Sequence, residues 1–135
     1  MRNSNIATFA PGDAGAIWLK CAIVYLLIGI SMGIAMGLTK NFTLMPVHAH
    51  INLLGWATTA LSGLIYSVFP RAGHSIFAKA HFWLANIAMP LMAASLAALL
   101  LGNQIVVPVL VASEIMAACG VILLAINIFT HLEEV

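Results

Sequence analysis

The sequence predicts an all-α membrane protein whose four transmembrane helices run up, down, up and down through the bilayer. Of its 135 residues, 63% are hydrophobic and only 7% are charged, whereas a water-soluble domain carries about 25% charged residues. The apolar residues form four stretches, and each is close to the roughly 20 residues that a helix needs to cross the hydrocarbon core. Because the connections between them are short, we expect a single integral membrane domain over residues 1–135.

The four spans share an uninterrupted apolar character, and in chain order they cover about residues 17–38, 46–69, 76–101 and 106–129. Pro46 falls in the first turn of the second span, where its missing N–H costs no hydrogen bond. Pro90 and Pro108 fall within the third and fourth spans. In a membrane helix a proline more often kinks or starts the helix than ends it, so neither proline divides a span.

Small and polar residues give two of the spans a packing pattern. The first span contains Gly29, Gly33 and Gly37, a spacing that lets another helix approach closely. The second span carries a stripe of polar and small residues at successive helical turns: His48, Asn52, Gly55, Thr59, Ser62 and Tyr66. Cys21 and Cys119 fall inside apolar spans, so we interpret them as packing residues and expect no disulfide.

The few basic residues predict the orientation of the chain in the membrane. Lys40 alone is expected at one end of the helices. The other four fall on the side that holds both ends of the chain and the central connection: Arg2, Lys20, Arg71 and Lys79. Since Lys and Arg mark the cytoplasmic side, both termini are predicted to be cytoplasmic, in a bacterial-type inner membrane. The net charge of +1 and the scattered basic residues do not suit a nucleic-acid partner.

The most informative segment is Pro46–Trp56, which reads PVHAHINLLGW and starts the second span. An ionisable side chain at membrane depth costs roughly 2.5–3.5 kcal/mol when charged, so a functional role is the default interpretation. His48 and His50 are two residues apart and should point about 200° apart on a helix, toward different neighbours. We expect them to bind haem iron or another metal, and Asn52, one turn after His48, to orient its ring.

Three further residues are weaker candidates. His81 enters its span from the opposite side, roughly 20 Å deeper than His50 by helical rise, so one iron cannot bind both within a protomer. Cofactor ligation, packing and proton handling all stay open for His81. Glu114 is expected near mid-membrane, in proton transfer or hydrogen-bonded to a neighbouring helix. Met36, with Met32 and Met45 at similar depth, is an alternative axial ligand. Other polar residues are expected to face solvent: His74, His131, Glu133 and Glu134.

The residues from His50 onward resemble a helix of a known family. His50–Leu54 reads HINLL, Gly63–Tyr66 reads GLIY, and Val68–Pro70 reads VFP. Together they resemble the second helix of subunit I in the haem–copper oxidase and nitric oxide reductase superfamily. The segment HFWL at His81–Leu84 is similar to one in short stand-alone membrane proteins related to these oxidases. The resemblance implies that His50 is an axial ligand of a low-spin haem near the outer face.

Subunit I of that superfamily is built from three arcs of four helices, so a homotrimer of this chain would rebuild its twelve-helix ring. The resemblance then implies haem b between protomers, held by His50 of one copy and His48 of its neighbour. Such a haem suits electron transfer or redox chemistry with a redox partner or quinol. The chain lacks the family's three-histidine copper site and active-site tyrosine, so a complete oxidase is not expected, although minimal O₂ or NO reduction stays open.

Two alternatives use the same features. A copper- or zinc-binding membrane protein would employ the same imidazoles. A haem carrier or assembly factor for an oxidase would use the helices as an interaction surface.

Overall fold

The computed structural model of the chain describes residues 13–132, and within this range every long element is a helix. The elements in order are α1 (Asp13–Thr39), α2 (Met45–His50), the π-helix η1 (Ile51–Thr58), α3 (Thr59–Val68), α4 (Pro70–Gly73), α5 (Ile76–Leu100), the short 3₁₀ turn η2 (Gln104–Val106) and α6 (Val107–His131). They form four helices that are long and apolar enough to cross a membrane: Ala14–Thr39, Met45–Val68, Ile76–Leu100 and Gln104–His131. The chain is therefore a multi-pass, all-α membrane protein by length and composition.

The observed spans begin and end within one helical turn of the predicted ones. Pro46 and Pro108 lie in the first turns of α2 and α6, whereas α5 continues through Pro90. The expectation that these prolines start or interrupt helices without ending them is confirmed. Ser75 begins α5 by accepting a hydrogen bond from the backbone N–H of Ala78 at 3.0 Å, which satisfies one of the free donors of the first turn.

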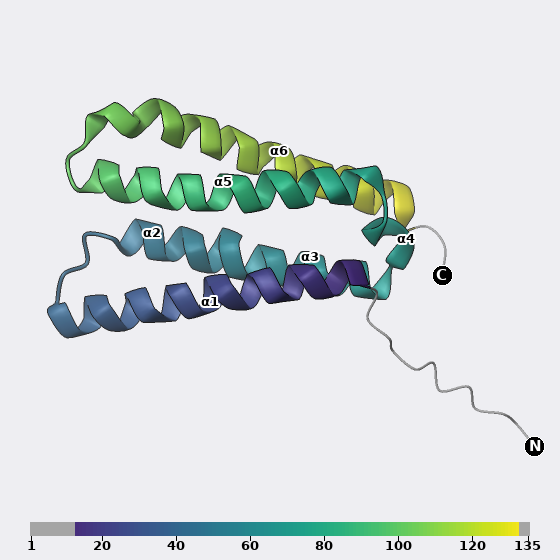
Figure 1. Cartoon of the computed structure of the whole chain (residues 1–135), viewed down its shortest axis with the longest axis horizontal. Coiled ribbons are helices and arrows are strands. Elements are labelled where there is room, and N and C mark those ends of the chain that lie inside the picture. Colours follow the sequence, from purple (N-terminus) through teal and green to yellow (C-terminus); the bar gives the residue numbers. More distant parts are fainter. Residues whose placement is uncertain (1–12, 133–135) are drawn as a thin grey trace, which may run out of the picture.

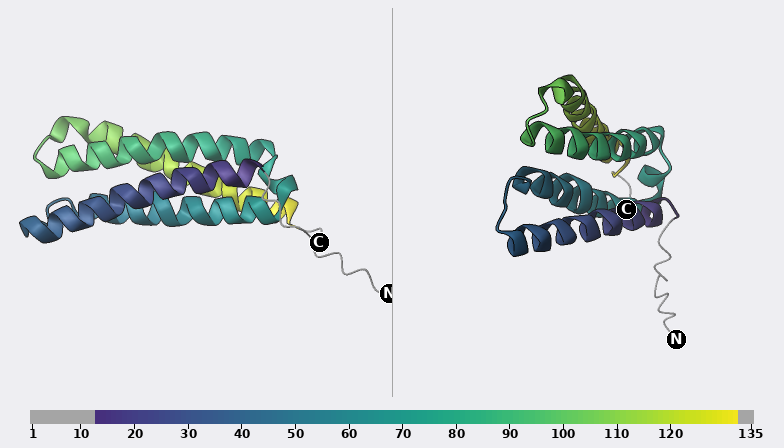
Figure 2. Two further views of the ribbon diagram at one scale, coloured as in Figure 1. Left: turned by 60° about the horizontal axis from the view of Figure 1, so that its bottom comes forward. Right: turned by 60° about the vertical axis from the view of Figure 1, so that its left-hand side comes forward.

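The long helices are arranged as two antiparallel hairpins (Figure 1). The first hairpin pairs α1 with the α2–η1–α3 span, and the second pairs α5 with α6. Figure 2 shows α5 on the side of the second hairpin that faces the first, and Met89 of α5 packs there with Val47 and Ile51. Helix α1 begins and helix α6 ends at the same end of the bundle, where α4 joins the hairpins (Figure 1).

The buried core is small and divided into two clusters. The cluster near α4 consists of Trp18, Tyr66, Ala72 and Ala78, and the second consists of Val47, Ile51 and Met89. In the most apolar stretch of each span, only 17% to 33% of the residues are buried inside the chain. Most of the apolar helix surface therefore faces outward, toward lipid or toward further helices.

Two of the three glycines in the first span are used inside the chain. A Cβ atom added at Gly29 would lie 2.5 Å from Oδ1 of Asn52, and one at Gly33 would lie 3.1 Å from Cε1 of His48. A Cβ at Gly37 would meet nothing within 4 Å. The close approach that the glycine spacing predicts thus occurs between α1 and the protein's own second span, at Gly29 and Gly33.

The second span is not one continuous α-helix, which periodicity alone did not predict. In a π-helix the backbone hydrogen bonds join residues five apart. Two side chains in η1 and α3 follow the same spacing, because Oγ1 of Thr58 donates to the carbonyl of Leu53 at 2.9 Å and Oγ1 of Thr59 to that of Leu54 at 3.4 Å. Four members of the predicted stripe are nevertheless buried: Gly55, Thr59, Ser62 and Tyr66.

Candidate functional site

His48 lies on α2 with its ring against α1. Its Nδ1 is 2.9 Å from the carbonyl oxygen of Gly29. A carbonyl only accepts hydrogen bonds, so this contact makes Nδ1 the nitrogen that carries the proton. The side-chain amide of Asn52 donates to the carbonyl of His48 at 2.8 Å and lies 3.2 Å from Nδ1 and 3.5 Å from Nε2 of the ring. Asn52 therefore contacts His48 with its shortest hydrogen bond to the backbone, and its role in orienting the ring stays a prediction.

His50 faces a different part of the molecule. Its Nδ1 is 2.7 Å from the carbonyl oxygen of Pro46, one turn earlier on the same helix. Its ring lines a groove of about 270 Å³ between the second span and the α5–α6 hairpin. The other lining residues are Leu54, Met92, Glu114, Ala117, Ala118 and Val121. The two imidazoles thus address different neighbours, in agreement with their spacing on the helix.

The hydrogen bonds of the two rings follow a common arrangement. Each ring donates its Nδ1–H to a backbone carbonyl, from Gly29 for His48 and from Pro46 for His50. Metal-binding histidines almost always donate the second ring N–H in this way, because the contact fixes the tautomer and the orientation of the ring. In both residues the lone pair is then on Nε2, the nitrogen that would bind a metal ion.

Glu114 lies on the exposed side of α6, in the same groove as His50. Counting the helical rise from the outer ends of their helices puts Met92 of α5 and Glu114 at about the same depth. Met92 was not predicted as a site residue, although this count applied to the third span would have found it. A thioether, an imidazole and a carboxylate therefore line one otherwise apolar groove.

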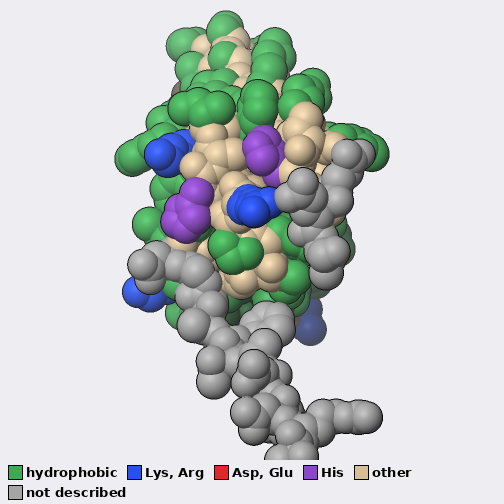
Figure 3. Space-filling view, turned by 90° about the vertical axis from the view of Figure 1, so that its right-hand side faces the viewer, with side chains coloured by type: hydrophobic (Ala, Val, Ile, Leu, Met, Phe, Trp, Pro, Cys, Tyr) green, Lys and Arg blue, Asp and Glu red, His purple; other side chains and the backbone are tan. Residues whose placement is uncertain are grey.

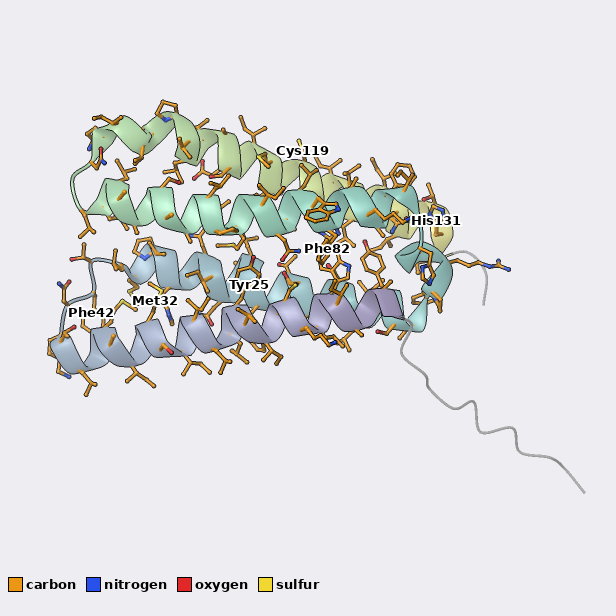
Figure 4. The ribbon with its side chains drawn as sticks, in the orientation of Figure 1. Tyr25, Met32, Phe42, Phe82, Cys119 and His131 are labelled. Atoms are coloured by element: carbon orange, nitrogen blue, oxygen red, sulfur yellow. The ribbon has the colours of Figure 1, made fainter. Side chains whose placement is uncertain are left out.

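The other methionine candidates lie elsewhere. Met36 is buried on α1, and Met45 is exposed at the start of α2. Met32 packs against the core cluster of Val47, Ile51 and Met89, and Figure 4 shows it on the inner side of α1. Within residues 13–132, no group of three or more His, Cys, Asp or Glu side chains could hold a metal ion. A site made by one copy from these residue types alone is thus not formed in that range.

His81 is part of the core, with 1% of its surface exposed. Its Nδ1 lies 3.2 Å from the hydroxyl of Tyr66, and its ring lies against that of Trp18 with 4.5 Å between centroids. Figure 4 shows Phe82, the next residue, directed from α5 toward α1, where its ring meets Trp18 edge-on at 5.2 Å. Cofactor ligation, packing and proton handling were open for His81, and the structure shows packing.

Asn127 is the residue that sequence analysis missed in this region. Its side chain is completely buried on α6 and contacts three separate segments. Its amide nitrogen donates to the carbonyl of Ala72 at 2.9 Å and to the hydroxyl of Tyr66 at 3.4 Å, and its oxygen accepts from Ser75 at 2.7 Å. Burying a side-chain amide without hydrogen-bond partners costs free energy. An asparagine within an apolar span therefore predicts hydrogen-bond partners, and this was the indication available in the sequence.

The remaining polar and sulfur-containing residues lie outside these sites. Cys21 and Cys119 are unpaired, so the expectation of no disulfide between them is confirmed. Figure 4 shows Cys119 on the outer side of α6. His74 is exposed, as expected, and His131 at the end of α6 is half-buried. Arg2, Glu133 and Glu134 lie outside the described residues. No family model, curated protein or solved structure matches this chain.

Proposed function

We propose that this chain is a membrane haem b protein for electron transfer or redox chemistry. The observation that carries the proposal is the contact of each Nδ1 with a backbone carbonyl, at 2.9 Å for His48 and 2.7 Å for His50. These contacts prepare both Nε2 atoms for an iron. The resemblance of His50–Leu54 to a haem-binding helix of the oxidase superfamily supports haem over other cofactors. In the proposed site His50 of one copy and His48 of a neighbouring copy would hold the iron.

The groove at His50 has one feature that suits a haem and one that requires a second copy. Apart from His50 and Glu114 its lining is apolar, which suits the faces of a porphyrin. Its volume of about 270 Å³ is below the roughly 300–1,000 Å³ of typical ligand pockets. One copy therefore provides one wall of the proposed site, and a second copy has to complete it. The largely outward-facing apolar surface of the spans favours such an assembly, for which we propose a homotrimer.

A haem held by two imidazoles supplies one-electron transfer, with its potential set by the axial ligands and their surroundings. In this proposal the residues of the chain do the rest. Gly29 and Pro46 hold the ring tautomers through their carbonyls, and Gly33 leaves room for the ring of His48. Apolar side chains of the groove surround the ring of His50.

Optical spectra test the proposal directly. The protein is purified in detergent after haem-replete expression, and oxidised and dithionite-reduced spectra are recorded for the wild type, His48→Ala and His50→Ala. We expect sharp, split α and β bands in the reduced wild type and their loss in both variants. His74→Ala, at an exposed position outside the spans, is the matched control and should keep the bands. A wild-type spectrum without a Soret band would refute haem binding.

Co-expression distinguishes ligation between copies from ligation within one copy. His48→Ala and His50→Ala chains with different tags are expressed together, and assemblies carrying both tags are isolated. Where a His48→Ala copy supplies His50 and its neighbour supplies His48, an intact ligand pair is restored, so we expect haem to return to the mixed assemblies. If both variants lose haem and the mixture does not regain it, the ligands are not shared as proposed.

The residues that line the groove also favour copper as a second candidate for the bound cofactor. The thioether of Met92 and the imidazole of His50 line the same space, and soft sulfur together with imidazole suits copper. This alternative predicts a purified protein that is colourless in the Soret region yet loaded with copper. Metal analysis of the wild type and of Met92→Leu would distinguish it, since a haem protein keeps its iron in that variant.

The proposed orientation places both termini in the cytoplasm of a bacterial-type inner membrane. Lys, Arg and His side chains gather on the end of the bundle that holds α4 (Figure 3). Lys and Arg are enriched on the cytoplasmic side of membrane proteins, which supports this orientation. His48 and His50 would then lie near the outer face.

A further inference from the structure

A small cavity lies inside the bundle beside His81, apart from the two histidines of α2. Its volume is about 30 Å³, and a cavity needs about 10–15 Å³ to hold one water molecule. Its polar lining residues are His81 of α5, Thr58 of η1 and Thr59 of α3, and the rest of the lining is apolar. The cavity thus has the size for one water and polar groups from both hairpins.

The hydrogen bonds around Asn127 determine which way each donor points. The Ser75 hydroxyl donates to Oδ1 of Asn127 at 2.7 Å. Nδ2 of Asn127 has two hydrogens, and one goes to the carbonyl of Ala72 at 2.9 Å. A carbonyl cannot donate, so the orientation of the amide follows from this contact. The second hydrogen of Nδ2 points to the hydroxyl oxygen of Tyr66 at 3.4 Å.

This orientation favours one tautomer of His81. Since the oxygen of Tyr66 accepts from Asn127, its own hydrogen is free to go to Nδ1 of His81, 3.2 Å away. Nδ1 is then an acceptor, and a neutral imidazole must carry its proton on Nε2. The ring is 1% exposed and lines the cavity, so the cavity is the space available to a partner of Nε2.

We propose that this cavity is a binding site for one water molecule, which accepts the Nε2–H of His81 and donates to oxygen atoms of the second span. Oγ1 of Thr58 and Oγ1 of Thr59 each give their hydrogen to a backbone carbonyl, at 2.9 Å and 3.4 Å. Each oxygen therefore keeps lone pairs that can accept from a water. The site completes a polar network that runs from Ser75 to η1 and links the two hairpins. It does not depend on the haem proposal.

The structure also indicates how water reaches the site. The cavity and the groove at His50 share three lining residues, Leu54, Ala117 and Val121. The two spaces are therefore adjacent, and these side chains separate them. Water in the cavity is therefore expected to exchange with water in the groove.

Solid-state NMR of the full chain in lipid nanodiscs, with ¹⁵N-labelled histidine, tests the proposal. The His81 signals are assigned by their loss in His81→Gln. We expect Nε2 of His81 to be protonated, Nδ1 to be unprotonated, and Nε2–H to receive polarisation from water. Ala85→Val fills the cavity from α5 and should abolish this transfer, whereas Ala112→Val, at an exposed site on α6, should leave it unchanged.

Several results would overturn the proposal. These are a proton on Nδ1 of His81, the absence of water transfer to Nε2 in the wild type, and unchanged transfer in Ala85→Val. The first two do not depend on Ala85→Val, so the proposal is testable even if that variant does not fold.

Discussion

At the scale of single residues, the position of His48 depends on glycines in another helix. The ring lies over Gly33, and its Nδ1 reaches the carbonyl of Gly29. Asn52 lies against Gly29 while its amide donates to the carbonyl of His48. A side chain at either glycine would occupy the space of the imidazole or of the amide that contacts it.

Gly29→Ala is expected to destabilise the protein, because its Cβ would lie 2.5 Å from Oδ1 of Asn52 and force the amide away from His48. Overpacking of this kind costs about 1–3 kcal/mol. Thermal unfolding in detergent should show a lower midpoint for Gly29→Ala than for the wild type. Gly37→Ala meets nothing within 4 Å and is the matched control. Equal midpoints for the two variants would show that the contact at Gly29 does not matter.

At the scale of elements, the π-helix η1 decides how the two ends of the second span are rotated relative to each other. His48 precedes η1 and Tyr66 follows it, and both contact α1, His48 at Gly29 and Tyr66 at Trp18. π-helical turns inside α-helices are rare and frequently occur at functional sites. The π-helix thus lies between the proposed haem ligands and the network at His81 within one span.

Deletion of Leu53, an outward-facing residue of η1, is expected to return the span toward α-helix. A π-turn accommodates more residues than an α-turn, so an α-helix with one residue fewer keeps the preceding segment close to its present rotation relative to α3. Asn52 should then still face Gly29. A disulfide between cysteines placed at these two positions, in a chain with Cys21→Ser and Cys119→Ser, should form with Leu53 present and also after its deletion. Leu53→Ala keeps the number of residues and is the control, and loss of the cross-link in the deletion would contradict this account.

At the scale of the whole molecule, the small core and the outward-facing apolar surface are the dominant features. A chain with so little internal burial relies on lipid or on further copies to cover its helices. Glu114 strengthens this expectation, because an exposed carboxyl on a membrane span is costly unless something polar covers it. The proposed trimer would place protein against these surfaces.

Cysteine labelling of intact cells tests the orientation of the molecule. In the chain with Cys21→Ser and Cys119→Ser, cysteines are introduced at Asn41 or Asn103, in the two connections at the end away from α4. We expect a membrane-impermeant maleimide to label both positions from outside, whereas a cysteine at His74 should react only after lysis. The reverse pattern would mean that the Lys and Arg distribution does not orient this protein.

The sequence by itself determined the class of the protein and the order and limits of its spans. These features are local, because the length of an apolar run decides whether a helix crosses the membrane and a proline such as Pro46 marks its first turn. It also predicted that His48 and His50 face different neighbours, since helical geometry requires it.

Only the tertiary structure decided which surfaces meet. Four features were not predicted: the π-helix, the packing of His48 against Gly33, the groove that Met92 and Glu114 both line, and the hydrogen bond between Asn127 and Tyr66. Each joins residues far apart in the chain or depends on how one helix is rotated against another. That rotation is set by the packing of whole helix faces, and residue spacing within one span does not determine it.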